Sequence, residues 1–378
     1  MAASISFNTS TNGLGRVADN EDNVSGLYFL IAAPTAYGTA KFKRYRNIAA
    51  IVADGITEAS ANYSEVYYQA SEFFRFAPGA ELFLLFTGIN FPDDLILNPV
   101  MQGRIKQIGV NVTDLGASIT QWQSVATNAE YQKAPLFIVA GYTPTTAILP
   151  TQNLATSQAP NVSVLICGDG AGKGSALATA LGRSYIPCVG ALLGTMAKAK
   201  VNESVGWVEK YNLSNGTELE VIKASNGATN IGFGFQDFMR YVTLVKYVGR
   251  SGTYFADNHT ASAKAGNDFA YMNDVRVMNK VKRELYKVYL PMLNSPLKVD
   301  AVTGALETMT INRFENVGDK ALNPMQAADE ISGFGVYVNP NQNVLATGTL
   351  EISVEIVPIG VARNIVLNLS FAAKLTTT

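Results

Sequence analysis

The clearest hydrophobic pattern in the chain is an alternation of apolar and polar residues close to its C-terminus. It begins at Thr349, breaks at Pro358-Ile359-Gly360 and then resumes, with Val366 as the one exception. Alternation with a period of two places every second side chain on one face of a strand. The sequence therefore predicts two consecutive strands, whose apolar faces are formed by Leu350, Ile352, Val354 and Ile356 and by Ile365, Leu367, Leu369 and Phe371.

Apolar segments of strand length alternate with helical segments between about residues 27 and 235. This order is typical of α/β proteins. The expected helices cover residues 58–76, 114–128 and 175–181. The expected strands cover residues 27–32, 81–86, 135–139, 162–167, 185–189 and 206–210, and the apolar run 48–52 also has the length of a core strand.

Beyond residue 235 the pattern changes, because one long amphipathic helix is expected between Asn267 and Tyr289, with apolar residues every three or four positions. Strands are expected at 241–248 and 333–338, and shorter helices at 312–321 and 325–331. Residues 1–25 are polar and rich in turn-forming residues, which favours an extended arm. The predicted organisation is an arm at 1–26, an α/β domain at 27–235 and a second α/β domain at 236–378. The predicted fold class is thus α/β (α+β), with mixed-sheet domains, flanking helices and extended N- and C-terminal β-arms.

Composition narrows the functional classes. The chain has 378 residues, of which 48% are hydrophobic and only 16% charged, and its net charge is −1. Such a chain folds around large cores, carries no global field that would attract nucleic acid, and contains no apolar run of membrane-spanning length. The N-terminal residues also lack the basic and apolar regions of a secretory signal. A low charged fraction indicates a surface that is covered in use, and we expect no nucleic-acid or membrane partner.

The chain contains one histidine, His259, and two cysteines, Cys167 and Cys188. These residue types supply most acid–base, nucleophilic and metal-ligating chemistry, so their scarcity disfavours an enzyme or a metal protein. We expect His259 in a polar loop and both cysteines reduced, as in cytoplasmic proteins. Catalytic, cofactor and metal residues are therefore predicted to be none, although a catalytic pair of carboxylates remains open; the pair Asp93-Asp94 reads more simply as a turn.

The glycine-rich stretch Gly168–Ser175 is the one motif that suggests a nucleotide. A phosphate-binding P-loop requires two glycines five residues apart, then lysine, then serine or threonine. Here Cys167 takes the place of the first glycine and Gly174 follows Lys173, so the hydroxyl is displaced by one position. An α/β enzyme that binds a nucleotide or phosphate at this loop remains the alternative hypothesis.

The long helix between Asn267 and Tyr289 has a basic face that includes Lys280, Lys282, Arg283 and Lys287. Such a face is either solvated or contacts an acidic partner in an assembly.

Several segments together resemble the tail sheath proteins of contractile phages and related contractile injection systems. They are Asn12-Gly13-Leu14-Gly15-Arg16 followed by Asp22–Leu27, the stretch Gly252–Thr260 ahead of the long helix, and the closing pair of strands around Val357-Pro358-Ile359-Gly360. The resemblance covers the N-terminal arm and about residues 235–378. It does not separate a phage tail from a tailocin or another injection device.

The resemblance implies a structural subunit that polymerises helically around an inner tube and contracts from a metastable extended state to drive tube injection. Subunits of this family insert terminal arms into the sheets of neighbours, which implies strand exchange here through Ile5, Phe7 and the two rows of apolar residues near the C-terminus. Gly13, Gly15, Pro358 and Gly360 would be hinges, and Lys280, Arg283 and Lys287 would contact the tube or a neighbour. The implied partners are further copies of the chain (a helical homopolymer), the inner tail tube protein, and baseplate and tail terminator proteins. The implied location is a virion tail or injection particle assembled in the bacterial host cytoplasm.

Two rival hypotheses make different predictions. The enzyme hypothesis predicts saturable nucleotide binding, with a monomer or a small closed oligomer. The second rival is another structural virion protein, such as a tube or baseplate component. The sheath hypothesis predicts open-ended helical polymers, because head-to-tail contacts that do not close form filaments.

Overall fold

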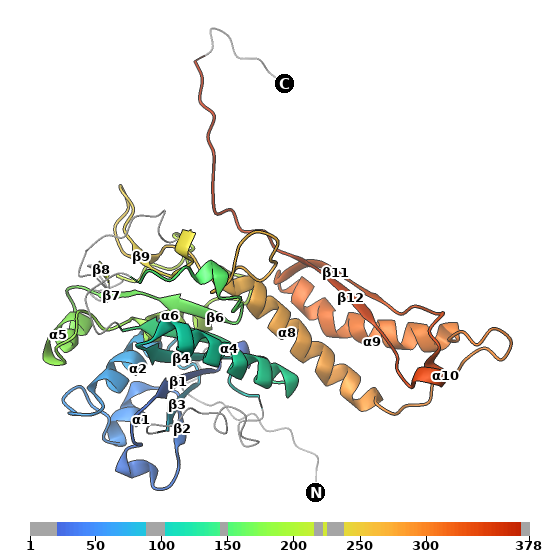
Figure 1. Ribbon diagram of the computed structural model, residues 1–378, viewed down its shortest axis with the longest axis horizontal. Helices are drawn as coiled ribbons and strands as arrows, with labels where there is room; N and C mark the ends of the chain where they lie inside the picture. Colours follow the sequence, from blue (N-terminus) through green and yellow to red (C-terminus); the bar gives the residue numbers. More distant parts are fainter. Residues whose placement is uncertain (1–20, 88–102, 144–149, 215–221, 225–237, 372–378) are drawn as a thin grey trace, which may run out of the picture.

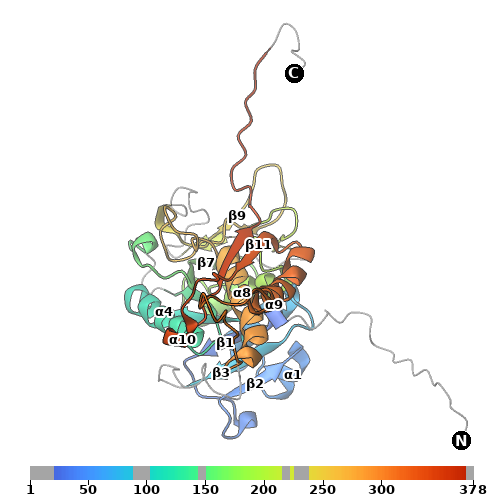
Figure 2. The ribbon, with the colours of Figure 1, turned by 90° about the vertical axis from the view of Figure 1, so that its right-hand side faces the viewer.

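The computed structural model describes residues 21–87, 103–143, 150–214, 222–224 and 238–371. A body built around a large sheet carries a unit of two long helices and a hairpin on one side (Figure 1). The last described residues leave this body as an extended segment, which both views show projecting away from it (Figure 2).

The body is organised by a six-stranded sheet in the order β2-β3-β1-β4-β5-β6. Strand β2 is antiparallel to β3, and the other neighbours are parallel, so the sheet is mixed as the sequence predicted. The strands are β1 (Ser25–Phe29), β2 (Phe42–Tyr45), β3 (Leu82–Phe86), β4 (Gln107–Val112), β5 (Phe137–Tyr142) and β6 (Val162–Leu165).

Alternate residues of these strands build two cores, one on each face of the sheet. On one face Leu27 and Leu84 pack with α2 (Ser64–Phe76) and α6 (Val189–Lys198). On the other face Tyr28 and Leu85 pack with α4 (Leu115–Tyr131). The short helix α1 (Ile48–Ala53) adds Ile51 to the first core. This arrangement is the doubly covered sheet expected of an α/β fold.

Helices α2 and α6 lie so close that Gly190 is required at their contact. A Cβ atom at Gly190 would lie 1.9 Å from the carbonyl oxygen of Gln69. The Gln69 side chain accepts a hydrogen bond from the Gly190 N–H at 2.7 Å and donates one to the Pro187 carbonyl at 2.7 Å. These bonds satisfy backbone groups at the start of α6 and join the two helices.

Smaller elements surround the sheet. Strand β7 (Cys167–Asp169) pairs with β8 (Ile222–Ala224), and β9 (Leu244–Val245) pairs with β10 (Tyr254–Phe255). Helix α5 (Lys173–Ala180) and the short 3-10 helices η1 (Glu21–Asn23), η2 (Thr35–Tyr37) and η3 (Leu154–Thr156) complete the body. Tyr241 and Ala261 lie in the core beneath α4, and Val242 and Phe255 lie in the opposite core. The cores of the sheet therefore include chain beyond residue 236, where the sequence suggested a boundary.

The helical unit begins with α8 (Met272–Tyr289), which continues into η4 (Leu290–Met292), and is followed by α9 (Thr308–Ala327). An antiparallel hairpin of β11 (Ile331–Tyr337) and β12 (Ser353–Pro358), with α10 (Val344–Thr347) between its strands, completes the unit. Val277 of α8, Leu322 of α9 and Ile331 of β11 share a small core, against which Phe334 and Ile356 pack.

Several expected elements differ from the structure. Residues 48–52 are helical, because the Asn47 side chain accepts the Ala50 N–H and so starts α1. The strand expected at 185–189 is replaced by a single bridge at Pro187 and the start of α6, and residues 206–210 form turns. The helices expected at 312–321 and 325–331 are one helix, α9, which contains Pro324 near its end. Of the strand expected at 241–248, only β9 forms.

Candidate functional site

In the glycine-rich loop at residues 168–175, backbone N–H groups donate hydrogen bonds to the side chain of Asp169, a residue of the same loop. The Asp169 carboxylate accepts hydrogen bonds from the backbone N–H groups of Ala171 at 3.0 Å, Gly172 at 2.8 Å and Gly174 at 3.0 Å. Asp169 is fully buried. Backbone N–H groups that converge in such a turn form an anion site, and here an internal carboxylate already occupies it. An external phosphate would therefore find these backbone N–H groups occupied and could bind mainly the exposed Lys173 side chain.

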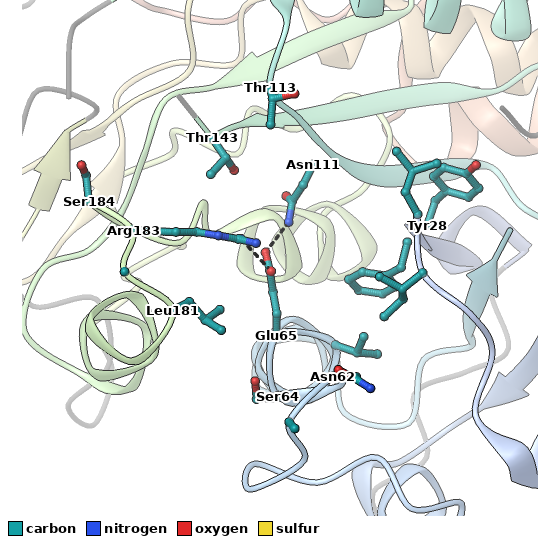
Figure 3. A pocket seen from close by; sticks show the side chains of 16 residues that line it. Tyr28, Asn62, Ser64, Glu65, Asn111, Thr113, Thr143, Leu181, Arg183 and Ser184 are labelled. Atoms are coloured by element: carbon teal, nitrogen blue, oxygen red, sulfur yellow. Dashed lines mark hydrogen bonds and ion pairs between the residues drawn. The ribbon is translucent and has the colours of Figure 1, made fainter. Parts of the chain in front are cut away.

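A polar cavity of about 660 Å³ lies at the carboxyl ends of β1, β4 and β5 (Figure 3). In open α/β sheets this edge is the usual place for ligands. Its charged groups neutralise each other, since one Glu65 oxygen accepts from Asn111 at 2.5 Å and the other pairs with Arg183 at 2.8 Å. The buried Thr143 hydroxyl has no hydrogen-bond partner among the described residues. The cavity can form hydrogen bonds, but its one carboxylate, Glu65, is already engaged by Asn111 and Arg183.

The single histidine and the two cysteines are buried. His259 lies in an irregular polar segment, which contains one isolated bridge, but its side chain is only 1% exposed, and its Nε2 lies 4.0 Å from Asp257 Oδ2. Burial raises the pKa of Cys167 to about 12 and that of Cys188 well above its usual value, so both thiols stay protonated. Within the described ranges no cluster of His, Cys, Asp or Glu is suited to hold a metal ion. None of the described helices is long and apolar enough to cross a membrane.

The basic face of α8 binds acidic residues of the same chain. Asp22, at the start of the described chain, pairs with Arg283 and, at 2.7 Å, with Lys280, which also pairs with Glu330 at 2.8 Å. Glu21 pairs with Lys287 at 2.5 Å. The remaining cation of the predicted face, Lys282, pairs with Glu130 of α4 at 2.5 Å. The face is thus neither merely solvated nor an open basic patch, and a contact of Lys280, Arg283 and Lys287 with a tube or neighbour stays a prediction.

Electrostatics favour the charged forms of these acids. Burial alone would raise the pKa of Glu21, but its hydrogen bond to Lys287 and the charge of Lys106 lower that pKa to about 2. The pKa of Asp22 is likewise lowered, because the attraction of Arg283 and Lys280 outweighs its burial. We call the group formed by Glu21, Asp22, Lys280, Arg283 and Lys287 the N-terminal anchor. It fixes the start of the described chain to α8.

A second group of side chains holds the chain just beyond β12. The Arg363 guanidinium lies over the Tyr271 ring, 3.4 Å from its centroid. Its Nη2 lies 3.2 Å from the Asn258 side-chain oxygen and 3.1 Å from that of Asn273, and its Nε lies 3.4 Å from Asp257 Oδ2. We call Arg363 and these four partners the C-terminal anchor. Asn273 belongs to the first turn of α8.

The segment after Arg363 is extended and pairs with no described strand. Its apolar row, Ile365, Leu367, Leu369 and Phe371, is between 76% and 110% exposed. Large apolar side chains in one exposed row are unusual in a monomer and indicate an interaction site. The strand predicted at 365–371 is absent from the isolated subunit, because strand geometry requires a neighbouring strand.

The other predicted assembly residues lie in different surroundings. Leu350 and Ile352 pack against the cluster around Phe314 of α9, whereas Val354 and Ile356 lie in β12 and pack toward α8 and α9. These four residues therefore make contacts within the subunit, and their exchange stays a prediction. Pro358 pairs with Ile331 in the hairpin, and Gly360 follows it. Ile5, Phe7, Gly13 and Gly15 lie outside the described residues.

Sequence reasoning missed the residues of both anchors except the α8 lysines and Arg283. The sequence offers one signal for the C-terminal anchor, since Arg363 is the only charged residue between Glu355 and Lys374.

Two family descriptions match the chain. Residues 108–259 match the DUF2586 N-terminal domain and residues 268–376 match the DUF2586 C-terminal domain. The interval between the two matches lies just before α8. No curated protein matches the chain by sequence.

Among solved structures, the chain is similar to one described as the anti-feeding prophage (AFP) helical sheath in its contracted state. The TM-score is 0.64 at 15% identity, and the alignment covers 98% of both chains. It is also similar to a chain of the AFP baseplate, 6-fold symmetrised, with a TM-score of 0.65 at 13% identity and coverage of 98% of this chain and 99% of that chain. Over nearly its whole length, therefore, the chain has the fold of these components of a contractile particle, as its resemblance to tail sheath proteins predicted.

Proposed function

Because the chain matches both DUF2586 domains and has the fold of contractile sheath and baseplate chains, we propose that it is the sheath subunit of a contractile tail or injection particle. In this proposal it polymerises helically around an inner tube through the exchange of β-strands and contracts from a metastable extended state. Similarity over 98% of both chains to a helical sheath supports this proposal most directly.

The C-terminal segment has the properties of a donor strand. Its described part, residues 364–371, is extended, has an apolar row that faces solvent, and pairs with no described strand. A donor strand adds to a sheet edge through backbone hydrogen bonds, and its alternate side chains fix the register. Ile365, Leu367, Leu369 and Phe371 would supply that register, together with the N-terminal residues Ile5 and Phe7.

The hairpin β11–β12 is the best acceptor in the described chain. It is a two-stranded sheet, so the outer edge of each strand has no neighbour among the described strands. Its inner face is covered by α8 and α9, which leaves the edges as the open sites. Natural proteins rarely leave long edges uncovered, and a donor strand from a neighbour at each edge would cover them.

The chemistry of the described residues favours a structural rather than an enzymatic role. Asp169 occupies the loop that could have bound phosphate, and the cavity near Glu65 has its charges paired. The energy for contraction would then come from the folded subunits rather than from a bound nucleotide. The proposed partners are further copies of the chain, the inner tail tube protein, and baseplate and tail terminator proteins, in a particle assembled in the bacterial cytoplasm.

Negative-stain electron microscopy of the purified full chain tests the proposal. We expect open tubular polymers, which disappear when residues 364–378 are removed. A full chain that gives only discrete particles of uniform size, over a range of salt and protein concentrations, would contradict the sheath role. Closed rings of fixed size would instead support a baseplate component, for which the similarity to an AFP baseplate chain is the specific observation.

A further inference from the structure

Both ends of the described chain are held by the same helix. The N-terminal anchor joins Asp22 to Lys280 and Arg283 of α8, and the C-terminal anchor joins Arg363 to Asn273 of α8. Asn273 and Arg283 are ten residues apart, which is about 15 Å along an α-helix. The two attachment points, Asp22 and Arg363, are thus held apart by a helix of fixed length.

The two asparagines that bind Arg363 are also fixed by contacts that do not involve the arginine. Asn258 and Asn273 are buried and hydrogen-bonded to each other at 2.8 Å, and their oxygens both point to Arg363 Nη2. The backbone carbonyl of Asn258 accepts the Met272 N–H at 2.9 Å, which ties this pair of asparagines to the start of α8. A planar guanidinium that stacks on an aromatic ring and donates to several fixed acceptors loses little conformational freedom per hydrogen bond, and lysine cannot replace it.

Helix α8 is itself fixed to the body of the molecule. The buried Arg276 side chain donates to the carbonyl of Met196 at 2.7 Å, at the end of α6, and to that of Lys200 at 3.3 Å. With Lys282 bound to Glu130, α8 touches both helical layers that cover the sheet. A force on α8 would therefore be transmitted through α6 and α4 to both faces of the sheet, and not to a single loop.

We propose that α8 is a strut that holds the roots of both terminal arms at a fixed separation, with Arg363 and Asp22 as its two attachment points. It follows that the C-terminal arm pivots beyond Arg363, at Asn364, and not at the Pro358 and Gly360 hinge that the sequence suggested. A pull on one arm then moves the root of the other arm, instead of unzipping β12 from β11.

The distance between the two roots tests the strut in the dilute, unpolymerised subunit. Spin labels are attached in the full chain at Glu21→Cys, the first described residue, which is exposed, and at Asn364→Cys. Cys167 and Cys188 are buried and escape labelling. Double electron–electron resonance then measures the distance distribution. We expect a narrow distribution that becomes at least about twofold broader with Arg363→Gln or Asp22→Asn. The substitution Arg313→Gln, at an exposed position of α9, is the matched control and should leave the width unchanged.

A second label pair separates the two attachment points. With labels at Asn128→Cys on the exposed side of α4 and at Asn364→Cys, only Arg363→Gln should broaden the distribution, and Arg363→Lys should not restore it. If Asp22→Asn fails to fold, Lys280→Gln removes one of the two cations that hold Asp22 and should broaden the distribution of the first label pair partially. A parent distribution as broad as that of Arg363→Gln would overturn the strut. Since the measurement uses the unpolymerised subunit, its outcome is independent of whether the chain forms a sheath.

Discussion

The carboxylate of Asp169 lies 2.8 Å from the backbone nitrogen of Gly172 and takes the position that a bound anion would have in this glycine-rich turn. The alternative hypothesis of a nucleotide-binding enzyme depends on this loop. The Asp169 carboxylate is part of the same chain and accepts hydrogen bonds from three backbone N–H groups. Its effective concentration at these groups is therefore high, and an external phosphate would have to displace it.

We therefore expect no saturable binding of Mg–ATP or inorganic phosphate by isothermal titration calorimetry, at ligand concentrations up to about 1 mM. Asp169→Ala should lower the free energy of unfolding by about 2 kcal/mol, because three N–H groups lose their acceptor. Asp114→Ala, at an exposed position, is the control. The enzyme hypothesis would regain support if the parent chain bound Mg–ATP or phosphate saturably and if Asp169→Ala did not increase that affinity.

The N-terminal anchor makes a second prediction. Asp22→Asn leaves Arg283 and Lys280 with one carboxylate fewer in a largely buried site, so the free energy of unfolding should fall by about 2–4 kcal/mol. Urea denaturation followed by circular dichroism measures the change. Asp329→Asn is the matched control, because Asp329 is exposed and its positive φ of 56° suits asparagine equally well. Equal stabilities of the two variants would show that the anchor contributes nothing.

Asp274 of α8 gives a prediction of pH dependence. Burial raises its pKa to about 6 despite the nearby Arg363, so the folded state binds the proton more tightly than the unfolded state does. The sign follows directly: this residue destabilises the fold progressively as the pH rises from about 4 to above 6, and the effect is relieved in acid. Asp274→Asn should therefore stabilise the protein at pH 8 by about 1–2 kcal/mol, after discounting for partial exposure, and should have little effect at pH 4. Urea denaturation at both pH values measures this, and a uniform effect at the two values would contradict the assignment.

The apolar row of the C-terminal segment should matter for assembly and not for folding. The double substitution Leu367→Asp and Leu369→Asp should change the free energy of unfolding by less than about 0.5 kcal/mol, since both side chains face solvent in the subunit. The same variant should form no tubular polymers. Asn368→Asp changes the opposite side of the segment and should still polymerise. Polymers from the double variant would exclude this segment as the donor strand.

The contact between α2 and α6 provides a test of the core. Gly190→Ala places a methyl group against the Gln69 carbonyl, and one of the two helices must move, which costs about 2–3 kcal/mol of stability. Gly335→Ala in β11 meets no atom within 4 Å of the new carbon and should have little effect. Chemical denaturation of both variants makes the comparison. A tolerated Gly190→Ala would mean that this contact is looser than described.

The parts of the fold that the sequence predicted are those with a local cause. The alternation from Thr349 predicted a strand, and β12 forms from Ser353 onward, where Val354 and Ile356 pack toward α8 and α9. Leu350 and Ile352 pack within the subunit but lie before the strand begins. The same alternation at 365–371 forms no strand here, because pairing depends on a partner that periodicity alone does not supply. Val189 begins a helix because the distant Gln69 side chain satisfies the backbone at that point, which a run of five apolar residues does not reveal.

The anchors show the same limit for charged residues. The basic face of α8 was evident as a pattern, but the acid that binds Arg283 is Asp22, separated from it by 261 positions. Long-range ion pairs leave no trace in spacing or composition. A single sequence therefore indicates that α8 carries cations and does not indicate that they are already satisfied within the chain.

The exposed row from Ile365 to Phe371 also has a consequence for the life of the protein before assembly. Every newly synthesised copy displays this row as soon as it has folded, and such segments are targets for chaperones, proteases and unspecific aggregation. Folding more tightly would not remove the hazard, since the row lies outside the cores. If the chain polymerises as proposed, the rate of its synthesis relative to the supply of growing ends would set how much of the protein is lost before it assembles.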